Sequence, residues 1–370
     1  MKCILNKSSL SDAITNVSRV IAGKSSVPAL EGVQLKAGQG ELTLTGYDME
    51  AGITTTIPAN TAEEGEIVLP ARLFLDMIKK MDCEEVSIAV NDRMITEIAG
   101  GAARFSILGI PSDEFPELPR VEEGEGVTLA QGALKSMIDQ TLFAIAQTDT
   151  KPIHTGSLFD FGKGKITIVS VDGYRLALRS EETDLESGEM RFVVPGKILG
   201  EIVKLLKDGG EEPVSMTVSK KHIAFRIGSY SVISRLLDGE FLDYRQSIPE
   251  GRGTTVKVGV RELIDGAERA SLLISDRLRS PLRVTFGEEG LIKISCSTPL
   301  GKSYDEVECE LSGETLEIGF NNRYLLDALK AADTDQVRIE LSGPLSPIKI
   351  LPPEGEGFLF LVLPVRLKND

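Results

Sequence analysis

The feature that most constrains the fold of this chain is an internal repeat that recurs three times. The stretches VLPARLFLDMIKKM (68–81), VVPGKILGEIVKLL (193–206) and GFNNRYLLDALKAA (319–332) align without gaps, at offsets of 125 and 126 residues. A basic residue, an acid and a lysine recur in each: Arg72, Asp76 and Lys79; Lys197, Glu201 and Lys204; Arg323, Asp327 and Lys330. Such self-similarity indicates one supersecondary unit copied along the chain.

A second set of related stretches supports the same period. Residues 9–21, 133–145 and 262–274 have apolar residues at helical spacing, and strand-like runs follow each. The 370 residues therefore predict an α+β protein of three domains, each with two helices packed on antiparallel sheets. Charged, glycine-rich linkers place the domains at 1–120, 127–250 and 254–370.

Composition excludes several classes of protein. No apolar run approaches the length of a signal peptide or of a membrane span, which needs about 20 residues. The four cysteines are scattered without CxxC spacing, so we expect free thiols and a cytoplasmic location. With only His154 and His222 and no metal-ligand spacing, the sequence shows no catalytic machinery, although an enzyme stays possible. We expect no catalytic residues, no metal and no cofactor.

The charge of the chain is unevenly distributed. The formal net charge is −15, which by itself argues against binding to nucleic acid. Six helical windows (8–24, 71–82, 131–147, 196–208, 261–279 and 321–333) nevertheless hold fifteen basic and twelve acidic residues, so the rest of the chain carries −18. The basic helix positions form either an ordinary solvated face with local ion pairs or a shared surface that follows a phosphate backbone.

The stretch VSVDGYRLALRS (169–180) predicts a hairpin with a type I′ turn at Asp172-Gly173. The cluster Tyr174-Arg175-Leu176 that follows has no counterpart in the other two repeats. What the three copies share builds the common architecture, so this cluster is the better candidate for a docking site. We expect Arg175 to bind a partner rather than to act in catalysis.

The triple repeat, VSVDGYRLAL, GEFLDYRQSIP, IGFNNRYLLDALK and the C-terminal FLVLPVRL together closely resemble the DNA polymerase III beta subunit family, the bacterial sliding clamps. The resemblance covers essentially the whole chain. It implies a head-to-tail homodimeric ring whose helices surround double-stranded DNA without reading its sequence. Such a ring tethers the replicative polymerase catalytic subunit, the clamp loader and other clamp-motif proteins of replication and repair, and so confers processivity. It implies no role in a membrane.

The resemblance also assigns residues to three surfaces. The DNA-facing residues would be Lys24, Arg72, Lys79, Lys80, Lys151 and Lys197. The dimer interface would join Arg104, Phe105 and Ile107 to Leu272, Leu273 and Ile274 of the other protomer. The partner-peptide pocket would contain His154, Val171, Gly173, Tyr174, Arg175, Leu176, Leu242, Gln246, Ser247, Asn321, Tyr324, Leu345, Pro347, Leu361, Leu363, Pro364, Val365, Arg366 and Leu367.

This chain departs from the family pattern at several pocket positions. Val171, Tyr174 and Leu242 stand where the family often has Thr, His and Pro, and Gln246 stands at a commonly basic position. A Lys-Asn-Asp extension follows the terminal Arg-Leu. Two alternative functions remain open from the residues themselves: a monomeric acidic scaffold that binds peptides without DNA, and a hydrolase that uses His154.

Overall fold

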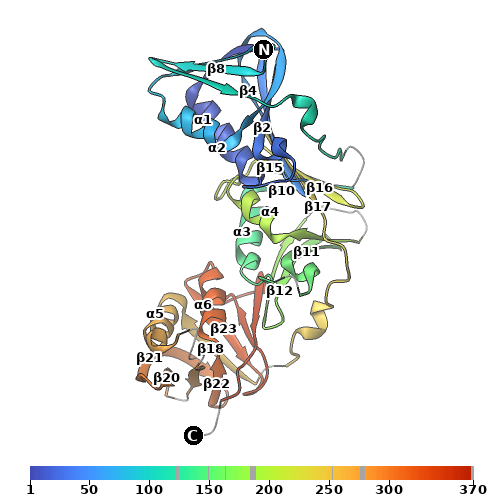
Figure 1. Ribbon diagram of the computed structural model, residues 1–370. Coiled ribbons are helices and arrows are strands. Elements are labelled where there is room, and N and C mark those ends of the chain that lie inside the picture. Colours follow the sequence, from blue (N-terminus) through green and yellow to red (C-terminus); the bar gives the residue numbers. More distant parts are fainter. Residues whose placement is uncertain are drawn as a thin grey trace. The chain divides into compact units, whose positions relative to one another are not determined.

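The computed structural model describes residues 1–121, 125–148, 150–162, 164–183, 189–251, 253–275, 280–287 and 289–367, so the C-terminal Lys-Asn-Asp lies outside it. Over these ranges the chain forms six α-helices and twenty-five β-strands (Figure 1), and every strand pairing is antiparallel. The α+β class is therefore confirmed. None of the described helices is long and apolar enough to cross a membrane.

The first repeat contains α1 and α2. Asn6 begins α1 because its side chain accepts a hydrogen bond from the backbone N–H of Ser9, at 3.1 Å. Helix α2 follows Pro70, as predicted, and buries Ala71, Phe74 and Ile78. The elements are β1 (Lys2–Asn6), α1 (Lys7–Val17), β2 (Gly32–Gly38), β3 (Glu41–Tyr47), β4 (Ala51–Pro58), β5 (Asn60–Glu63), β6 (Gly65–Pro70), α2 (Ala71–Lys80), β7 (Glu85–Val90), β8 (Ile95–Gly100) and β9 (Ala103–Leu108).

The second repeat contains α3 and α4 and has the order of elements of the first repeat without a counterpart of β5. Helix α4 follows Pro195, so the proline signal holds here too. The elements are β10 (Glu125–Ala130), α3 (Gln131–Leu142), β11 (Gly156–Gly162), β12 (Lys165–Val171), β13 (Arg175–Glu182), β14 (Met190–Pro195), α4 (Gly196–Val203), β15 (Pro213–Val218), β16 (His222–Ile227) and β17 (Tyr230–Arg235), and a 3₁₀ helix follows at Tyr244–Ser247.

The third repeat contains α5 and α6, which pack on each other (Figure 1). Asn321 caps α6 by accepting a hydrogen bond from the N–H of Arg323, at 3.0 Å. The elements are β18 (Thr254–Gly259), α5 (Val260–Ala270), β19 (Leu282–Phe286), β20 (Leu291–Thr298), β21 (Gly301–Ser312), β22 (Leu316–Phe320), α6 (Asn322–Ala331), β23 (Gln336–Leu341), β24 (Ile348–Leu351) and β25 (Phe358–Val362).

The chain forms two compact units, and the second repeat contributes to both. The first unit comprises Met1–Leu134 and Lys197–Leu236. It holds a five-stranded sheet of order β5-β1-β7-β8-β9 and an eight-stranded sheet of order β10-β15-β16-β17-β4-β3-β2-β6. The pairing of β17 with β4, with Tyr230 opposite Thr55, joins the second repeat to the first by main-chain hydrogen bonds.

The second unit comprises Lys135–Gly196 and the chain from Leu237 onward. Its twelve strands have the order β14-β11-β12-β13-β25-β24-β23-β18-β21-β20-β19-β22. Here β25 pairs with β13, with Val362 opposite Arg175, and so joins the third repeat to the second. The two joints between repeats within the chain therefore use the same kind of strand pairing.

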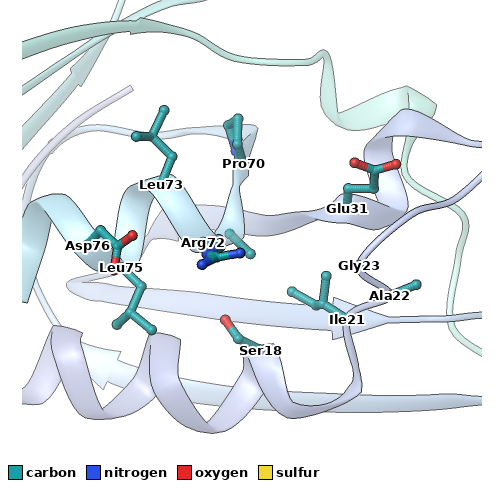
Figure 2. Close-up of a pocket in the computed structure, with 11 residues that line it drawn as sticks. Ser18, Ile21, Ala22, Gly23, Glu31, Pro70, Arg72, Leu73, Leu75 and Asp76 are labelled. Carbon is teal, nitrogen blue, oxygen red and sulfur yellow. The ribbon is translucent and has the colours of Figure 1, made fainter.

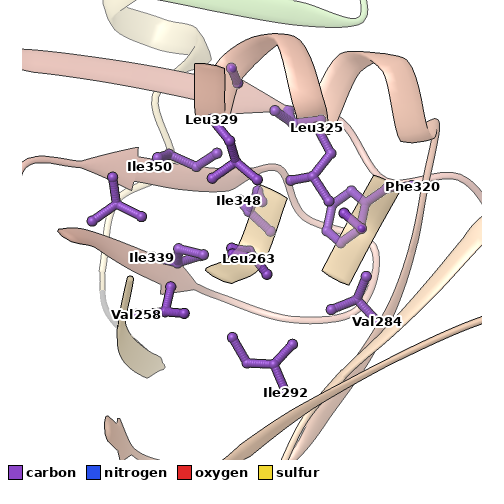
Figure 3. Packing of buried hydrophobic residues seen from close by; sticks show 14 of the residues in the cluster. Val258, Leu263, Val284, Ile292, Phe320, Leu325, Leu329, Ile339, Ile348 and Ile350 are labelled. Carbon is purple, nitrogen blue, oxygen red and sulfur yellow. The ribbon is translucent and has the colours of Figure 1, made fainter. Parts of the chain in front are cut away.

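The core of the third repeat lies between α5, α6 and the sheet (Figure 3). Phe320 and Leu329 are among its buried side chains, together with Ile339 and Ile350 from the sheet. Burial of a side chain of this size contributes about 1.5–3 kcal/mol. This packing fixes α6, which carries one wall of the candidate site described below.

Candidate functional site

The predicted hairpin is present, because β12 and β13 pair with Val171 opposite Leu176. Its turn is not type I′, and that prediction was wrong. Gly173 has a φ of +91°, but Asp172 does not adopt a positive φ. Instead, Asp172 Oδ1 accepts hydrogen bonds from the backbone N–H groups of Tyr174 (2.9 Å) and Arg175 (3.1 Å). An aspartate that closes a turn through its side chain needs no left-handed backbone of its own.

Arg175 follows this turn and is only 5% exposed. Its Nε donates to Asp172 Oδ2 at 3.0 Å, and its Nη1 donates to Asp327 Oδ2 on α6 at 2.5 Å. The guanidinium also lies over the rings of Tyr324 (4.7 Å) and Phe143 (5.4 Å). Arg175 therefore holds the second-repeat hairpin against α6 of the third repeat.

Tyr174, by contrast, is 60% exposed. Its ring stacks on Tyr324, with centroids 5.7 Å apart and an interplanar angle of 22°. Because Arg175 packs beneath Tyr324, the two tyrosines form an aromatic surface supported by a buried cation. A surface of this kind can bind an apolar or planar side chain from a partner.

The C-terminal segment lies beside the hairpin. Leu361 is opposite Leu176 in the sheet, and the N–H of Leu363 donates to the carbonyl of Tyr174 at 2.9 Å. Farther along, the N–H of Val365 donates to Gly319 O at 2.7 Å. A β-carbon at Gly319 would lie 2.5 Å from the Val365 carbonyl oxygen, so only glycine allows this close approach.

The segment 241–247 is held in place by hydrogen bonds to Asp160. Oδ2 of this buried carboxylate accepts hydrogen bonds from Tyr244 Oη and Arg245 Nη2, both at 2.9 Å. Burial and this hydrogen bond raise the pKa of Tyr244 to about 12. The Phe241 ring meets His154 edge-on at 5.3 Å, and burial, with a smaller effect of Lys151, lowers the pKa of His154.

The predicted peptide-pocket residues thus divide by burial. Arg175 and the apolar residues Val171, Leu176 and Leu361 are buried, and the three apolar residues belong to one core cluster. Leu345 and Pro347 directly precede β24, whose Ile348 lies opposite Val362. The exposed members are Gly173, Tyr174, Leu242, Gln246, Leu345, Leu363, Val365 and Arg366, and the half-buried ones are His154, Ser247, Asn321, Tyr324, Pro347, Pro364 and Leu367.

Four residues that position this surface were not among the predicted site residues: Asp160, Asp172, Phe143 and Asp327. Asp172 was predicted only as a turn residue. Asp327 was visible only as the acid repeated in each second helix. Nothing local in the sequence could pair it with Arg175, because 152 residues separate the two.

The six predicted DNA-facing residues all have exposed side chains. Arg72, Lys79 and Lys80 lie on α2, away from its buried face. Lys197 is the second residue of α4, and its Nζ lies 2.7 Å from Asp48 Oδ2. Lys24 and Lys151 lie in the segments that follow α1 and α3, and neither has an ion pair within the described ranges.

A cavity of about 640 Å³ that the sequence did not predict lies beside Arg72. The start of α2, from Pro70 to Asp76, forms one wall, and Ser18–Gly23 with Glu31 forms the other (Figure 2). Most of its lining residues are apolar, among them Ile21, Leu73 and Leu75.

The residues predicted for the dimer interface lie on β9 and on the 3₁₀ turn Ser271–Leu273, with Ile274 directly after the turn. Strand β9 is the last strand of the five-stranded sheet, and Phe105 and Ile107 are half-buried on one of its faces. Arg104 Nη1 donates to the carbonyls of Gly101 and Ala103 at 2.9 and 2.8 Å. Leu272 is 83% exposed, whereas Leu273 and Ile274 are half-buried.

Part of β21 also pairs with a strand on one side only. Residues 301–308 pair with β20, and only the later residues 309–312 pair with β18. The outer side of 301–308 therefore has no strand partner among the residues described. Its neighbour Leu300 is 73% exposed, and Leu108 at the end of β9 is 70% exposed.

Comparison with known proteins divides the chain into the same three parts. Residues 1–119, 128–243 and 245–366 match the family profiles of the N-terminal, central and C-terminal domains of the DNA polymerase III beta subunit. A beta sliding clamp of Staphylococcus epidermidis is 31% identical over 363 residues, which is 95% of this chain and 96% of that protein.

Solved structures agree with the sequence matches. The DNA polymerase sliding clamp of Bacillus subtilis is 31% identical, with a TM-score of 0.96 and coverage of 100% of both chains. A putative DNA polymerase III beta subunit of Eubacterium rectale is 32% identical, with a TM-score of 0.94, and the match covers 99% of this chain and 100% of that one.

Proposed function

The chain belongs to the DNA polymerase III beta subunit family, the bacterial sliding clamps, and from this premise we propose that it acts as a homodimeric ring around duplex DNA. It is a non-catalytic processivity factor of replication. Its domain boundaries are proposed at 1–120, 127–250 and 254–370.

The observation that best supports the ring is the strand pairing that recurs between consecutive repeats. The N–H of Arg235, at the end of β17, donates to Glu50 O at 2.8 Å, and the N–H of Leu363, just after β25, donates to Tyr174 O at 2.9 Å. By strand register, Leu108 is the first-repeat counterpart of Arg235, because Leu108 pairs with Ile95 as Arg235 pairs with His222. Leu300 is the third-repeat counterpart of Tyr174, because Ser297 pairs with Lys302 as Val171 pairs with Leu176.

A third joint of the same kind would therefore pair β9 of one protomer with residues 301–308 of its partner. The N–H of Leu108 would donate to the carbonyl of Leu300 of the partner subunit. Two such joints close a ring, bury the exposed leucines and remove both open edges. Arg104, Phe105, Ile107, Leu272, Leu273 and Ile274 would lie at this interface.

Inside the ring, the basic helix residues would face the DNA phosphates, while the acidic sheets face outward. Contacts to phosphates carry no sequence information, so the ring can slide. Topological linkage keeps the protein on DNA, which is how a chain of net charge −15 can serve a polyanion. Lys24, Arg72, Lys79, Lys80, Lys151 and Lys197 are the proposed contacts.

The surface around Tyr174, Tyr324, Leu242 and Leu363 is the proposed docking site for partner peptides. Its exposed apolar side chains lie beside the end of a sheet and are held in place by Arg175 and Asp160. The proposed partners are the catalytic subunit of the replicative polymerase, the clamp loader and other clamp-motif proteins, in the cytoplasm.

One experiment tests the ring directly. Protein loaded on nicked circular DNA should be retained and should be released when the circle is cut to a linear form. Sedimentation should give twice the chain mass of 40.0 kDa. Equal retention on circular and linear DNA would contradict the ring. A monomer would instead favour an acidic scaffold that binds peptides without DNA.

A further inference from the structure

Three lysines occupy the same position in the three repeats, but among the residues described only one of them is free of ion pairs. Lys79 on α2, Lys204 just after α4 and Lys330 on α6 are related by the repeat offsets of 125 and 126 residues. Lys204 Nζ lies 2.9 Å from Glu201, and Lys330 Nζ lies 2.6 Å from Glu268 on α5. Within the described part of the chain, Lys79 has no ion pair.

The difference follows from two substitutions between repeats. Helices α1 and α5 each have eleven residues and are followed by a three-residue 3₁₀ turn, so Thr15 stands where α5 has Glu268. Thr15 Oγ1 donates instead to the carbonyl of Ser11 at 2.8 Å. Asp76 stands where α4 has Glu201, and its side chain is one methylene shorter and forms no pair with Lys79.

The residue after this lysine strengthens the contrast. It is Lys80 in the first repeat, Leu205 in the second and Ala331 in the third. Both Lys79 and Lys80 are exposed at the last turn of α2. An isolated cation attracts a phosphate over about a Debye length, roughly 8 Å at physiological salt, whereas the field of a cation beside its carboxylate largely cancels.

We infer that the three repeats contact DNA unequally, and that Lys79 and Lys80 of the first repeat supply the strongest phosphate contact at this helix position. Lys204 and Lys330 are held by carboxylates and contribute little. This inference rests on the proposed function. It adds which of the three equivalent lysine positions contributes most to DNA binding.

Charge-neutral double variants test the inference, because they leave the net charge and its long-range field unchanged. Lys79→Gln with Asp76→Asn is compared with the matched control Lys330→Gln with Glu268→Gln. Binding to a short fluorescent duplex is measured by anisotropy over a range of salt concentrations. The α2 variant should bind several-fold more weakly, and the slope of log K against log salt should become shallower by about 0.9 for each phosphate that the variant leaves unneutralised. The α6 variant should match the wild type.

A single substitution should change the affinity for the duplex in the opposite direction. Glu268→Gln frees Lys330 and should therefore strengthen duplex binding. Equal losses in the two double variants, or no gain from Glu268→Gln, would overturn the inference. Wild-type protein that slides off nicked circles would refute the proposed ring instead, so the two failures are distinguishable. Melting temperature and sedimentation of each variant show whether folding and assembly are intact.

Discussion

Arg175 Nη1 lies 2.5 Å from Asp327 Oδ2, so one ion pair connects the hairpin of the second repeat to the last helix of the third. The same guanidinium also binds Asp172. Because Arg175 is only 5% exposed and its Nε and Nη1 donate to Asp172 and Asp327, we expect it to shape the proposed peptide surface. Its role as a direct partner contact stays a prediction.

Replacing Arg175 should destabilise the protein. Arg175→Ala leaves Asp172 without its cation and Asp327 with only the more distant Arg323, at 3.9 Å. Removal of one partner of a largely buried pair costs about 2–4 kcal/mol when one carboxylate stays partly solvated. The free energy of unfolding in urea measures the loss. Arg175→Lys should recover only part of it, because an ammonium group cannot bridge both carboxylates and stack on Tyr324. Unchanged stability in Arg175→Ala would refute this structural role.

Replacing Tyr174 should weaken peptide binding and leave the stability of the protein almost unchanged. Tyr174→Ala should weaken binding of a polymerase-derived motif peptide by about 1–2 kcal/mol, since an exposed aromatic side chain contributes contact area to a partner. Stability should change little, because most of the ring is already in water. Calorimetric titration measures the affinity. An affinity equal to that of the wild type would place the peptide elsewhere.

Truncation after Leu363, combined with Arg175→Ala, should abolish peptide binding. The truncation removes Val365 and the segment that lies against Gly319, and the substitution frees the hairpin from α6. Sedimentation should still give a dimer, because neither change touches β9 or β21. Peptide affinity that survives both changes would contradict the pocket assignment.

A proline in β9 should break the dimer. Gly109 N donates to Met94 O at 2.8 Å, so alternate N–H groups of β9 face β8 and the N–H of Ser106 points outward. Ser106→Pro removes an outward donor and leaves the pairing with β8 intact. Sedimentation should give a monomer for Ser106→Pro and a dimer for the control Ser106→Ala. A dimer in both would exclude β9 from the interface.

Acidification should destabilise the fold through His154. Burial lowers the pKa of His154 below its usual value of about 6.5, so between the two values the unfolded chain binds more protons than the folded one. The contribution of neutral His154 to the free energy of unfolding is fully present above the pKa of the unfolded state. It is lost as pH falls from that value through the pKa of the folded state. Thermal melts between pH 7 and pH 5 should show a smaller decline for His154→Gln. Parallel curves for the two proteins would contradict this.

The helices could be predicted from the sequence because their signals are local. The window 131–147 holds α3 at Gln131–Leu142, and Pro70 and Pro195 mark the starts of α2 and α4. The repeat offset then supplied the equivalence between copies. The hairpin at Asp172-Gly173 was located correctly for the same reason, although its turn type depends on a side-chain hydrogen bond that the residue pair alone does not specify.

The tertiary pairings could not be predicted in this way. Asp160 with Tyr244 and Arg175 with Asp327 join residues far apart in the chain, and each acid has many possible basic or phenolic partners in the sequence. The pairing of Lys330 is also invisible locally, since it depends on Glu268 of the neighbouring helix, where the first repeat has Thr15. Only the pair of Lys204 with Glu201, three residues earlier, is local.

The strand joints between repeats also bear on how the chain is synthesised. Thr55 Oγ1 donates to Ser229 O across the joint of β4 with β17, and the two residues are 174 positions apart in the chain. At a translation rate of about 5–20 residues per second, β4 waits roughly 10–35 s on the ribosome for its neighbour. Strand β13 likewise waits for β25, which is made much later in the chain. The nascent chain therefore exposes two unpaired edges in succession, and its greatest risk of mispairing with another copy falls while the later strands are still being made.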